Sequence, residues 1–329
     1  MITSLPSFIG QDHVQAEILP FLNIHEARLS PPNRPAGVFM LAGPTGTGKT
    51  HLIRSIAKEL HGNSNHFLNI NCGEFQSDHE VAKIIGAPPG YLGHRETQPM
   101  LGPQRIKQYT SERCYMSLLL FDEFEKSAVA LEHLLYNVLD RGELQLADGT
   151  KASMEHCMIF FTTNIGDKHL AQNPDDHYTV REMIHARFSV PFMNRIDRVL
   201  VYKPLDRETA SRILELELRE AGRHIKEQYP RTKLEFSIDL PEHLLNLGFS
   251  EIMGARELKR AIWHKIYIPL SNEILRFNLQ DSRDHFTATI SPQGVEISQI
   301  TIYTPPPKPV ALGYDRYGWK TELTAEDML

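Results

Sequence analysis

The sequence predicts an α/β protein in which a parallel sheet is sandwiched by helices and followed by a small α/β domain. Three observations favour this class. A glycine-rich loop joins a short apolar strand to an amphipathic helix within residues 37–62, two later apolar strands end in polar side chains, and a shorter alternation of helices and strands begins near residue 203. Strands that are apolar along their whole length are typical of parallel sheets buried on both faces.

Length and composition indicate more than one domain. A chain of 329 residues exceeds the usual size of a single hydrophobic core, and a hydrophobic content of 41% is enough for two. We expect a large domain at 1–202, a small domain at 203–303 and a tail at 304–329. The net charge of −6 argues against a nucleic-acid-binding protein, although a local basic strip is compatible with it.

The sequence shows no signal for export, membrane insertion or a histidine-based metal centre. Its first ten residues lack a basic region, and no apolar run approaches the roughly 18 residues of a membrane span. Cys72, Cys114 and Cys157 have neither disulfide nor zinc spacing, and the 16 histidines form no HExxH pattern. We therefore expect a cytoplasmic protein with reduced cysteines.

The strongest local pattern is the loop "GPTGTGKT" at residues 43–50. Residues 38–41 predict a strand before it, and apolar side chains at helical spacing predict a helix after it that stops at Gly62. Glycines let backbone N–H groups surround phosphate oxygens at a helix start, Lys49 reaches the β- and γ-phosphates of ATP, and the Thr50 hydroxyl binds Mg²⁺. The predicted nucleotide-binding residues here are Gly43, Pro44, Thr45, Gly46, Thr47, Gly48, Lys49 and Thr50.

A second apolar strand within residues 114–127 ends in Asp122 and Glu123. At the carboxyl end of a parallel strand, Asp122 is expected to hold through water the Mg²⁺ that Thr50 binds, and Glu123 to polarise the attacking water. An acidic pair after an apolar run is also common where a strand simply meets solvent. The position of this pair, about seventy residues after the phosphate loop, favours the catalytic interpretation.

A third apolar strand, within residues 157–166, ends in Thr162, Thr163 and Asn164. Asn164 is expected to lie between the phosphate loop and the acidic strand end, where it would orient water against the γ-phosphate. A strand-terminal asparagine is otherwise common as a turn former. The functional interpretation therefore rests on its position in the sheet.

After the third strand, the pattern becomes that of a small α/β domain. An amphipathic helix is predicted over residues 206–225 and a short strand over 233–238. A long helix is expected over 255–277, because apolar side chains recur there at near-helical spacing. Two strands, around 285–290 and 295–303, complete the domain.

The tail at 304–329 differs in composition from the rest of the chain. Its proline-rich start, "TPPPKP", predicts a stiff extended spacer, and Tyr314, Tyr317 and Trp319 follow without any periodic pattern that would bury them. Two interpretations remain open. The tail is either disordered or loosely packed, or it is a docking arm for a neighbouring subunit or partner.

Taken together, these motifs resemble the AAA+ ATPases of the Clp heat-shock unfoldase family, and specifically the second ATPase module of the ClpA and ClpB type. The resemblance extends to about residue 280. Besides the phosphate loop, the agreeing motifs, in order, are "FIGQ" (8–11), "PPNRPAG" (31–37), "IGAPPGYLG" (85–93), "LLLFDEFEKS" (118–127), "TTNIG" (162–166), "FMNRID" (192–197) and "MGARELKRAI" (253–262).

The resemblance implies roles for three further residues. Arg195 matches the arginine finger, which reaches into the nucleotide site of a neighbouring subunit, and Arg256 matches the sensor arginine of the lid, which contacts the γ-phosphate of its own subunit. Ile9 matches the segment that lines the adenine pocket. Without the resemblance, either arginine would be equally compatible with a surface ion pair.

The loop "IIGAPPGYLGH" at 84–94 carries a tyrosine between glycines. Prolines and glycines at this density predict a loop, in which an aromatic ring would otherwise fold back on the core. In the family, an aromatic–aliphatic pair at this place lines the axial pore of a hexameric ring and grips polypeptide. The resemblance thus assigns Tyr91 and Leu92 to substrate binding.

The sequence departs from the family pattern at several points. The stretch between Tyr91 and Asp122 is longer than expected and contains Arg95, Arg105, Lys107 and Arg113, which fit solvated helix charges or a basic pore mouth. The interval between Asn164 and "FMNRID" has no aliphatic–Gly–hydrophobic docking tripeptide, so no partnership with the Clp peptidase is expected. The chain begins almost at "FIGQ", from which we expect a single ring without an N-terminal domain.

The resemblance implies an Mg-dependent ATPase that works as an ATP-driven protein unfoldase or remodelling motor. It would thread protein substrates through the axial pore of a homo-hexamer, with a possible adaptor. The alternative is an AAA+ remodeller or switch that acts on one dedicated protein complex, or on nucleic acid, without full threading. A third possibility is a module that binds ATP with almost no turnover.

Overall fold

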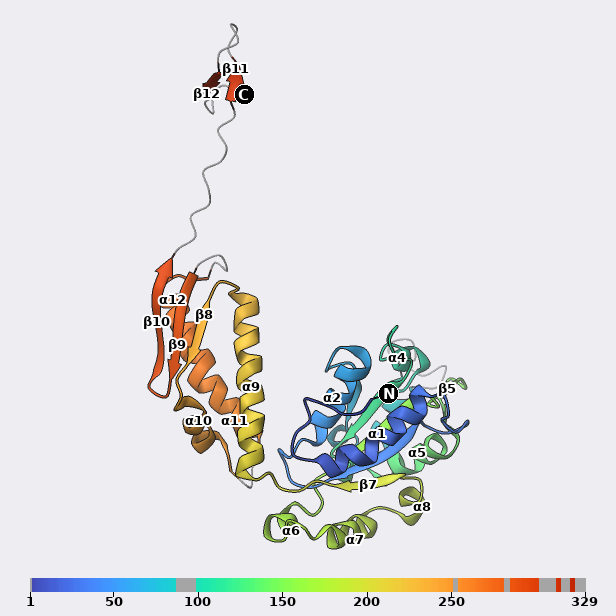
Figure 1. Ribbon diagram of the computed structural model, residues 1–329. Coiled ribbons are helices and arrows are strands. Elements are labelled where there is room, and N and C mark those ends of the chain that lie inside the picture. The colour runs from blue at the N-terminus through green and yellow to red at the C-terminus, as the bar shows by residue number, and fades with distance from the viewer. Residues whose placement is uncertain are drawn as a thin grey trace. The chain divides into compact units, whose positions relative to one another are not determined.

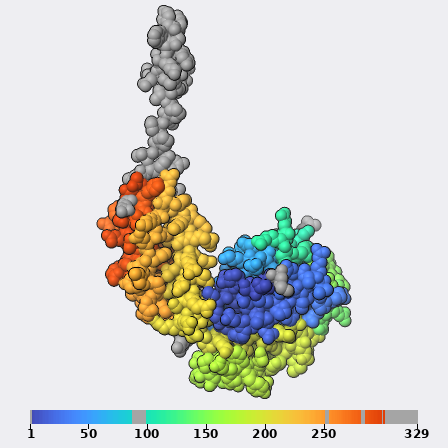
Figure 2. Space-filling view, in the orientation of Figure 1, coloured from blue at the N-terminus to red at the C-terminus, as the bar shows by residue number. Residues whose placement is uncertain are grey.

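The computed structural model describes residues 2–86, 99–250, 254–280 and 285–301, together with 312–314 and 320–322. The chain divides into two compact units. The first comprises residues 1–220 and 238–265, and the second comprises 221–237 and 266–329. On the face of the first unit that is visible in Figure 2, N-terminal residues (blue) lie beside residues from the middle of the chain (green).

The first unit is built on a parallel sheet (Figure 1). Its five strands have the order β2-β3-β6-β1-β7. In chain order the strands are β1 (Gly37–Ala42), β2 (Leu68–Asn71), β3 (Ser117–Asp122), β6 (Cys157–Thr163) and β7 (Arg198–Val201). β1 pairs with β6 on one side and with β7 on the other. The phosphate loop therefore leaves the sheet beside the ends of β6 and β7.

Both faces of this sheet are buried. All residues of β1 and β6 are buried, and successive side chains alternate between two hydrophobic clusters. Met40 and Phe121 belong to one cluster, whereas Phe39 and Leu120 belong to the other. This pattern explains why the strands are apolar throughout in the sequence.

Helices cover the two faces. α1 (Asp12–Glu26) and α2 (Lys49–His61) supply apolar side chains to the cluster that contains Phe39. α3 (Asp78–Ile85), α5 (Val129–Arg141) and α7 (His177–Arg187) supply side chains to the cluster on the opposite face. α2 ends at Gly62, whose φ of 76° is favourable for glycine at a helix end.

Shorter elements and the first part of the predicted small domain complete the first unit. The short elements are η1 (Cys72–Glu74), α4 (Pro103–Lys107), η2 (Phe124–Lys126), the antiparallel pair β4 (Glu143–Gln145) and β5 (Lys151–Ser153), α6 (Asp167–Gln172) and α8 (Val190–Met193). They are followed by the first part of α9 (Arg207–Gln228), by α10 (Leu240–Gly248) and by α11 (Arg256–Ile262).

The second unit contains a three-stranded sheet with the order β10-β9-β8. β8 (Lys233–Phe236) runs parallel to β9 (His285–Ser291), which pairs antiparallel with β10 (Gly294–Thr301). α12 (Ile268–Arg276) packs near β10. Within the predicted tail, β11 (Leu312–Tyr314) pairs antiparallel with β12 (Lys320–Glu322), whereas Tyr317 and Trp319 lie outside the described residues.

The helix expected over residues 255–277 is not a single α-helix. α11 passes into a π-helical turn, η3 (Trp263–Tyr267), and the chain then continues as α12. Pro269 lies at the start of α12 and has no N–H for the carbonyl four residues earlier, which accounts for the wider turn before it. In the part of the chain that the structure describes, no helix is long and apolar enough to span a membrane.

Candidate functional site

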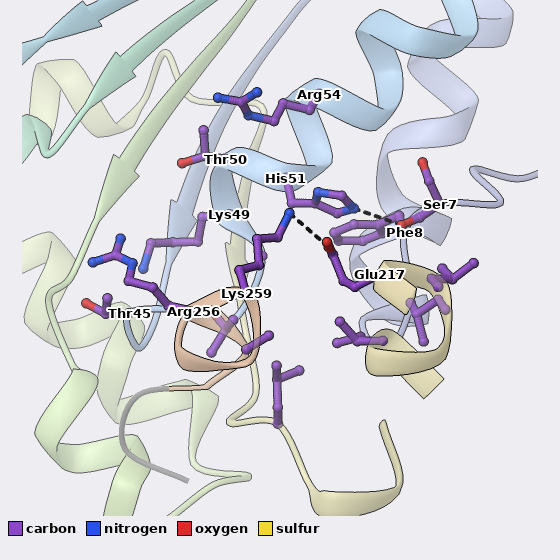
Figure 3. Close-up of a pocket in the computed structure, with 18 of the residues that line it drawn as sticks. Ser7, Phe8, Thr45, Lys49, Thr50, His51, Arg54, Glu217, Arg256 and Lys259 are labelled. Carbon is purple, nitrogen blue, oxygen red and sulfur yellow. Dashed lines mark hydrogen bonds and ion pairs between the residues drawn. The ribbon is translucent and has the colours of Figure 1, made fainter. Parts of the chain in front are cut away.

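A cavity of about 640 Å³ lies in the first unit, where β1, β3 and β6 end (Figure 3). One part of its lining is polar and comes from the phosphate loop and from the ends of β3 and β6. The other part is apolar and comes from the N-terminal segment and α9. The lining includes Phe8, Ile9, Thr45, Gly46, Thr47, Gly48, Lys49, Thr50, Asp122, Glu123, Thr162, Asn164, Ile213, Leu216 and Arg256.

The phosphate loop takes its shape from glycines with positive φ. Gly43, Gly46 and Gly48 have φ values of 137°, 79° and 102°, which side chains rarely allow. A Cβ atom on Gly43 would also lie 2.8 Å from the carbonyl oxygen of Tyr202. The loop leads directly into α2, so free N–H groups and the positive end of a 13-residue helix face the cavity.

Lys49 is fully hydrogen-bonded within its own chain. Its Nζ donates to the carbonyl oxygens of Gly43 (2.6 Å) and Pro44 (2.9 Å) and to Oδ1 of Asn164 (2.9 Å). Three acceptors match the three protons of an ammonium group. These bonds hold the amine at the loop, close to where a bound phosphate would offer competing oxygens.

Burial also affects the charge of Lys49. The pKa of its ammonium group is lowered to about 8, chiefly by loss of solvation and to a smaller extent by the positive charge of Arg256. The carboxylates of Glu125, Asp122 and Asp167 act in the opposite direction. The cavity is therefore a place where an additional anion would stabilise the charged form of Lys49.

Thr162 connects the acidic strand end with the neighbouring strand. Its Oγ1 donates to Oδ1 of Asp122 and accepts from the backbone N–H of Glu123 at 2.9 Å. Glu123 has a φ of 56°, a left-handed conformation that is rare for a residue with a side chain. Its carboxylate pairs with Lys126 at 2.7 Å. The role of Thr162 was not expected, because a threonine at a strand end has no distinctive sequence signal.

Asn164 links the third strand to both of the other polar elements. Its Oδ1 accepts from Lys49, and its backbone N–H donates to Oε1 of Glu125 at 3.2 Å. Asn164 thus lies between the phosphate loop and the turn after β3.

The apolar end of the cavity includes Ile9 beside Phe8, whose ring stacks on His51 at 6.5 Å between centroids. His51 Nε2 is hydrogen-bonded to the carbonyl oxygen of Ser7 at 2.8 Å (Figure 3). The buried Gln11 fixes this segment through two hydrogen bonds with the backbone of Lys203. The N-terminal segment is therefore well placed to form an apolar wall.

Arg256 lines the same cavity at the start of α11. The preceding Ala255 donates its backbone N–H to the carbonyl oxygen of Gly46 at 3.1 Å. Gly254 permits this approach, because it has a φ of 60° and a Cβ atom there would lie 2.6 Å from the same oxygen. The start of α11 is thereby attached to the phosphate loop.

Charged residues from α2, α9 and α11 complete the lining and have no local signature in the sequence. Lys259 pairs with Glu217 at 2.8 Å (Figure 3), and Lys58 pairs with Glu220 at 3.7 Å. These pairs join helices that lie far apart in the sequence. Helical spacing predicts that such residues are exposed, but not which of them meet.

Arg195 is not among the residues that line this cavity. It follows α8 and donates to Asp140 and to the carbonyl oxygen of Pro191, with its guanidinium carbon 4.9 Å from the centre of the Tyr136 ring. Tyr91 and Leu92 lie outside the described residues.

Two donors in the cavity, one on α2 and one at the end of β3, fit a magnesium ion. Thr50 and Asp122 both line the cavity, and hydroxyl and carboxylate oxygens are the hard donors that Mg²⁺ prefers. Thr162 orients the Asp122 carboxylate through Oδ1. Mg²⁺ commonly takes its remaining ligands from phosphate and water, so two protein donors are compatible with such a site.

Comparison with known families agrees with this arrangement. Residues 34–199 match the AAA domain (Cdc48 subfamily), and residues 205–288 match the C-terminal, D2-small domain of ClpB protein. The chain belongs to the AAA+ ATPases, as a module of the Clp type. Membership of this family implies nucleotide binding.

Relatives of this Clp-type AAA+ module include three ClpB chaperones. The chain is 33% identical over 280 residues to chaperone protein ClpB of Meiothermus ruber, with 83% of this chain and 32% of the relative covered. It is 34% identical over 271 residues to ClpB of Pseudomonas putida (81% and 31% covered) and 32% identical over 280 residues to mitochondrial ClpB4 of Arabidopsis thaliana (82% and 28% covered). The AAA+ module thus spans only about a third of the length of these relatives.

The AAA+ module also has the fold of a solved structure of Hsp104, determined by electron cryomicroscopy in a closed state with ATPyS and FITC casein. The TM-score is 0.74 at 24% identity, and the match covers 89% of this chain and 50% of the Hsp104 chain. The similarity extends to the parallel sheet flanked by helices and to the smaller domain that follows it.

Proposed function

We propose that this chain is the ATP-hydrolysing module of a protein-remodelling motor. The observation that carries the proposal is the convergence of Lys49, Asp122, Glu123, Asn164 and Arg256 on one cavity at the carboxyl edge of a parallel sheet. Ligands of α/β proteins bind at this edge, and these residue types suit a triphosphate. The division into a nucleotide domain at 1–202 and a lid at 203–303 is part of the same proposal.

The phosphate loop binds the triphosphate. The N–H groups at the start of α2 donate to phosphate oxygens, and Lys49 exchanges its bonds to Gly43, Pro44 and Asn164 for bonds to the β- and γ-phosphates. Ile9 contacts the adenine. When bound by Thr50 and Asp122, Mg²⁺ supplies electrostatic stabilisation of the phosphate oxygens.

Glu123 and Asn164 act on the attacking water. Glu123 accepts a proton from the water, and its carboxylate must leave Lys126 to do so. Asn164 orients the water after its Oδ1 has released Lys49. Arg256 contacts the γ-phosphate from the same subunit. Arg195 acts in trans as the arginine finger of the next subunit, which requires it to leave Asp140.

The complete motor is a homo-hexamer that threads protein substrates past Tyr91 and Leu92. Support comes from the ClpB relatives and from the fold shared with Hsp104, whose structure holds casein. The cytoplasmic location, a possible adaptor, the lack of a Clp peptidase partner and the docking role of residues 304–329 are further parts of the hypothesis. Remodelling of one dedicated complex without full threading, or an action on nucleic acid, remains the second candidate.

The first experiment uses Glu123→Gln as a substrate trap. This variant keeps the groups that bind ATP but cannot accept the proton of the attacking water, so it should bind ATP and fail to hydrolyse it. It is purified from native extract with ATP, beside a copy that also carries Tyr91→Ala. Retained proteins and nucleic acids are identified by mass spectrometry and sequencing.

Diverse proteins that are retained by Glu123→Gln and lost from the double variant support threading. One protein complex or nucleic acid held regardless of Tyr91 supports the second candidate and contradicts the pore-loop assignment. Unchanged ATP turnover in Glu123→Gln would show that the catalytic assignment is wrong.

A further inference from the structure

Glu132 on α5 is a buried carboxylate that the proposed mechanism does not use. It is only 4% exposed. Its Oε2 accepts from the backbone N–H of Ser189 at 3.3 Å and from the Ser189 hydroxyl at 3.0 Å, and its Oε1 lies 3.9 Å from the guanidinium of Arg187. Burial of a carboxylate is unfavourable unless it is bonded in this way. These contacts therefore hold the segment after α7 against α5.

Ser189 connects Glu132 to α8. The residue caps α8, where its Oγ accepts from the N–H of Phe192 at 3.4 Å. A second bond of 2.8 Å joins the same Oγ to the hydroxyl of Tyr136, one turn after Glu132 on α5. α8 has only four residues and little stability of its own, so these contacts hold it in place together with the packing of Phe192 in the hydrophobic core.

Arg195 follows directly after α8 and rests on the same two elements. Its guanidinium lies over the ring of Tyr136 and donates to a carbonyl oxygen of α8 and to Asp140 on α5. Within the described chain its buried Nε has no hydrogen-bond partner. The attraction between a cation and an aromatic ring uses none of the N–H groups, so contact with Tyr136 is compatible with an exchange of the hydrogen-bond acceptors of Arg195.

Glu132 is also connected, through Arg187, to the nucleotide site of the same chain. Arg187 donates to the carbonyl oxygen of Glu125 at 2.6 Å, in the turn that follows Glu123. Arg187 therefore contacts both the acidic turn and Glu132.

We propose that Glu132, Ser189 and Tyr136 form a positioning relay for Arg195. Glu132 holds Ser189 by hydrogen bonds, and Ser189 helps to fix the position of α8. The ring of Tyr136 packs against the guanidinium of Arg195. None of the three is among the residues that line the cavity, so each acts through Arg195. This inference rests on the proposed role of Arg195 as an arginine finger.

The test separates hydrolysis from binding. Arg195→Ala should lower kcat by roughly 10³-fold, and Tyr136→Leu by about 10- to 100-fold, since it leaves the guanidinium present but displaced. Tyr136→Phe keeps the ring and should lose only about threefold. The kcat of Ser189→Ala should lie between the kcat values of the two tyrosine variants. ATP affinity should stay unchanged in all of them, and Asn137→Ala, an exposed position on α5, is the matched control.

Mixing of subunits distinguishes positioning from damage to the fold. Arg195→Ala subunits keep their own catalytic site, and Glu123→Gln subunits keep a working finger, so mixed assemblies should recover turnover. Tyr136→Leu subunits should recover turnover with Glu123→Gln in the same way, because only the arginine that they offer to a neighbour is displaced. A general folding defect would not be rescued by a partner.

Wild-type kcat in both Tyr136→Leu and Ser189→Ala, or a Tyr136→Phe loss equal to that of Tyr136→Leu, would overturn the relay while leaving the finger in place. Loss of ATP affinity in Tyr136→Leu would equally overturn it. If Arg195→Ala itself keeps full turnover, or is not rescued by Glu123→Gln, the finger assignment fails and the relay fails with it.

Discussion

At the scale of single residues, the charge of Lys49 is the property most open to measurement. Burial lowers the pKa of its ammonium group to about 8 in the folded protein, against 10.5 for an ordinary lysine. Between these values the unfolded chain binds more protons than the folded chain, so this group makes the nucleotide-free protein more stable as pH rises from about 8 to 10.5. The affinity for nucleotide should have the opposite pH dependence, because phosphates bind the protonated amine of Lys49 more tightly than the neutral one.

We therefore predict that ATP affinity falls as pH rises above about 8, by up to roughly tenfold per pH unit. Titration calorimetry between pH 7.5 and 9.5 measures this directly. Lys49→Arg is the control, because its guanidinium stays charged throughout this range and should give a flat profile at lower affinity. A flat profile in the wild type would mean that Lys49 keeps its charge without nucleotide.

At the scale of elements, the contact between α11 and the phosphate loop depends on one glycine. Gly254→Ala places a methyl group against the carbonyl oxygen of Gly46 and should break the hydrogen bond from Ala255. One lost bond of this kind corresponds to about a tenfold weaker ATP affinity, because Arg256 moves with the start of α11. Fluorescent nucleotide titration measures the change.

Gly149→Ala provides the matched control. Gly149 also has a positive φ, of 86°, but nothing lies within 4 Å of its Cβ position. Both variants should lose about 1 kcal/mol of folding free energy from the left-handed backbone. Only Gly254→Ala should weaken nucleotide binding, and an equal effect of both variants on affinity would show that backbone strain alone is responsible.

The elements differ in how far the sequence predicts them. β1, β3 and β6 are apolar throughout and the stop at Gly62 is explicit, so their positions follow from local pattern. β2 has four residues that alternate between buried and exposed, and it was not predicted, because so short a pattern is compatible with a loop. The interruption of the 255–277 helix was also missed, since the apolar spacing continues across Pro269.

The residues of the site also differ in how far the sequence predicts their positions. Lys49, Asp122 and Asn164 stand at strand or loop ends with recognisable neighbours, and the fold brings them into contact or onto one cavity wall. The pairing of Glu217 with Lys259 depends on how helices pack, which no local pattern encodes. The same holds for the support of Arg195 by Tyr136.

At the scale of the whole molecule, the proposed site is incomplete in a single chain. Arg195 is held by residues of its own subunit away from the cavity, so hydrolysis should depend on assembly. We predict that ATP turnover per subunit falls as the protein is diluted, in step with the loss of oligomer measured by light scattering. Arg195→Ala should show a low rate that does not depend on concentration. Full turnover by isolated subunits would contradict a finger supplied in trans.

The position of β1 in the sheet also determines when the nucleotide site can form during synthesis. β1 and its loop are synthesised well before β6 and β7, the two strands that flank β1 in the sheet. Roughly a hundred residues separate Ala42 from Cys157, and at about 5–20 residues per second the ribosome needs roughly 5–20 s to supply them. For that time a fully apolar strand has no partner on either edge. The nascent chain is thus most exposed to aggregation before it can bind any nucleotide, and shortened chains that stop before β6 should remain unfolded whatever the ATP concentration.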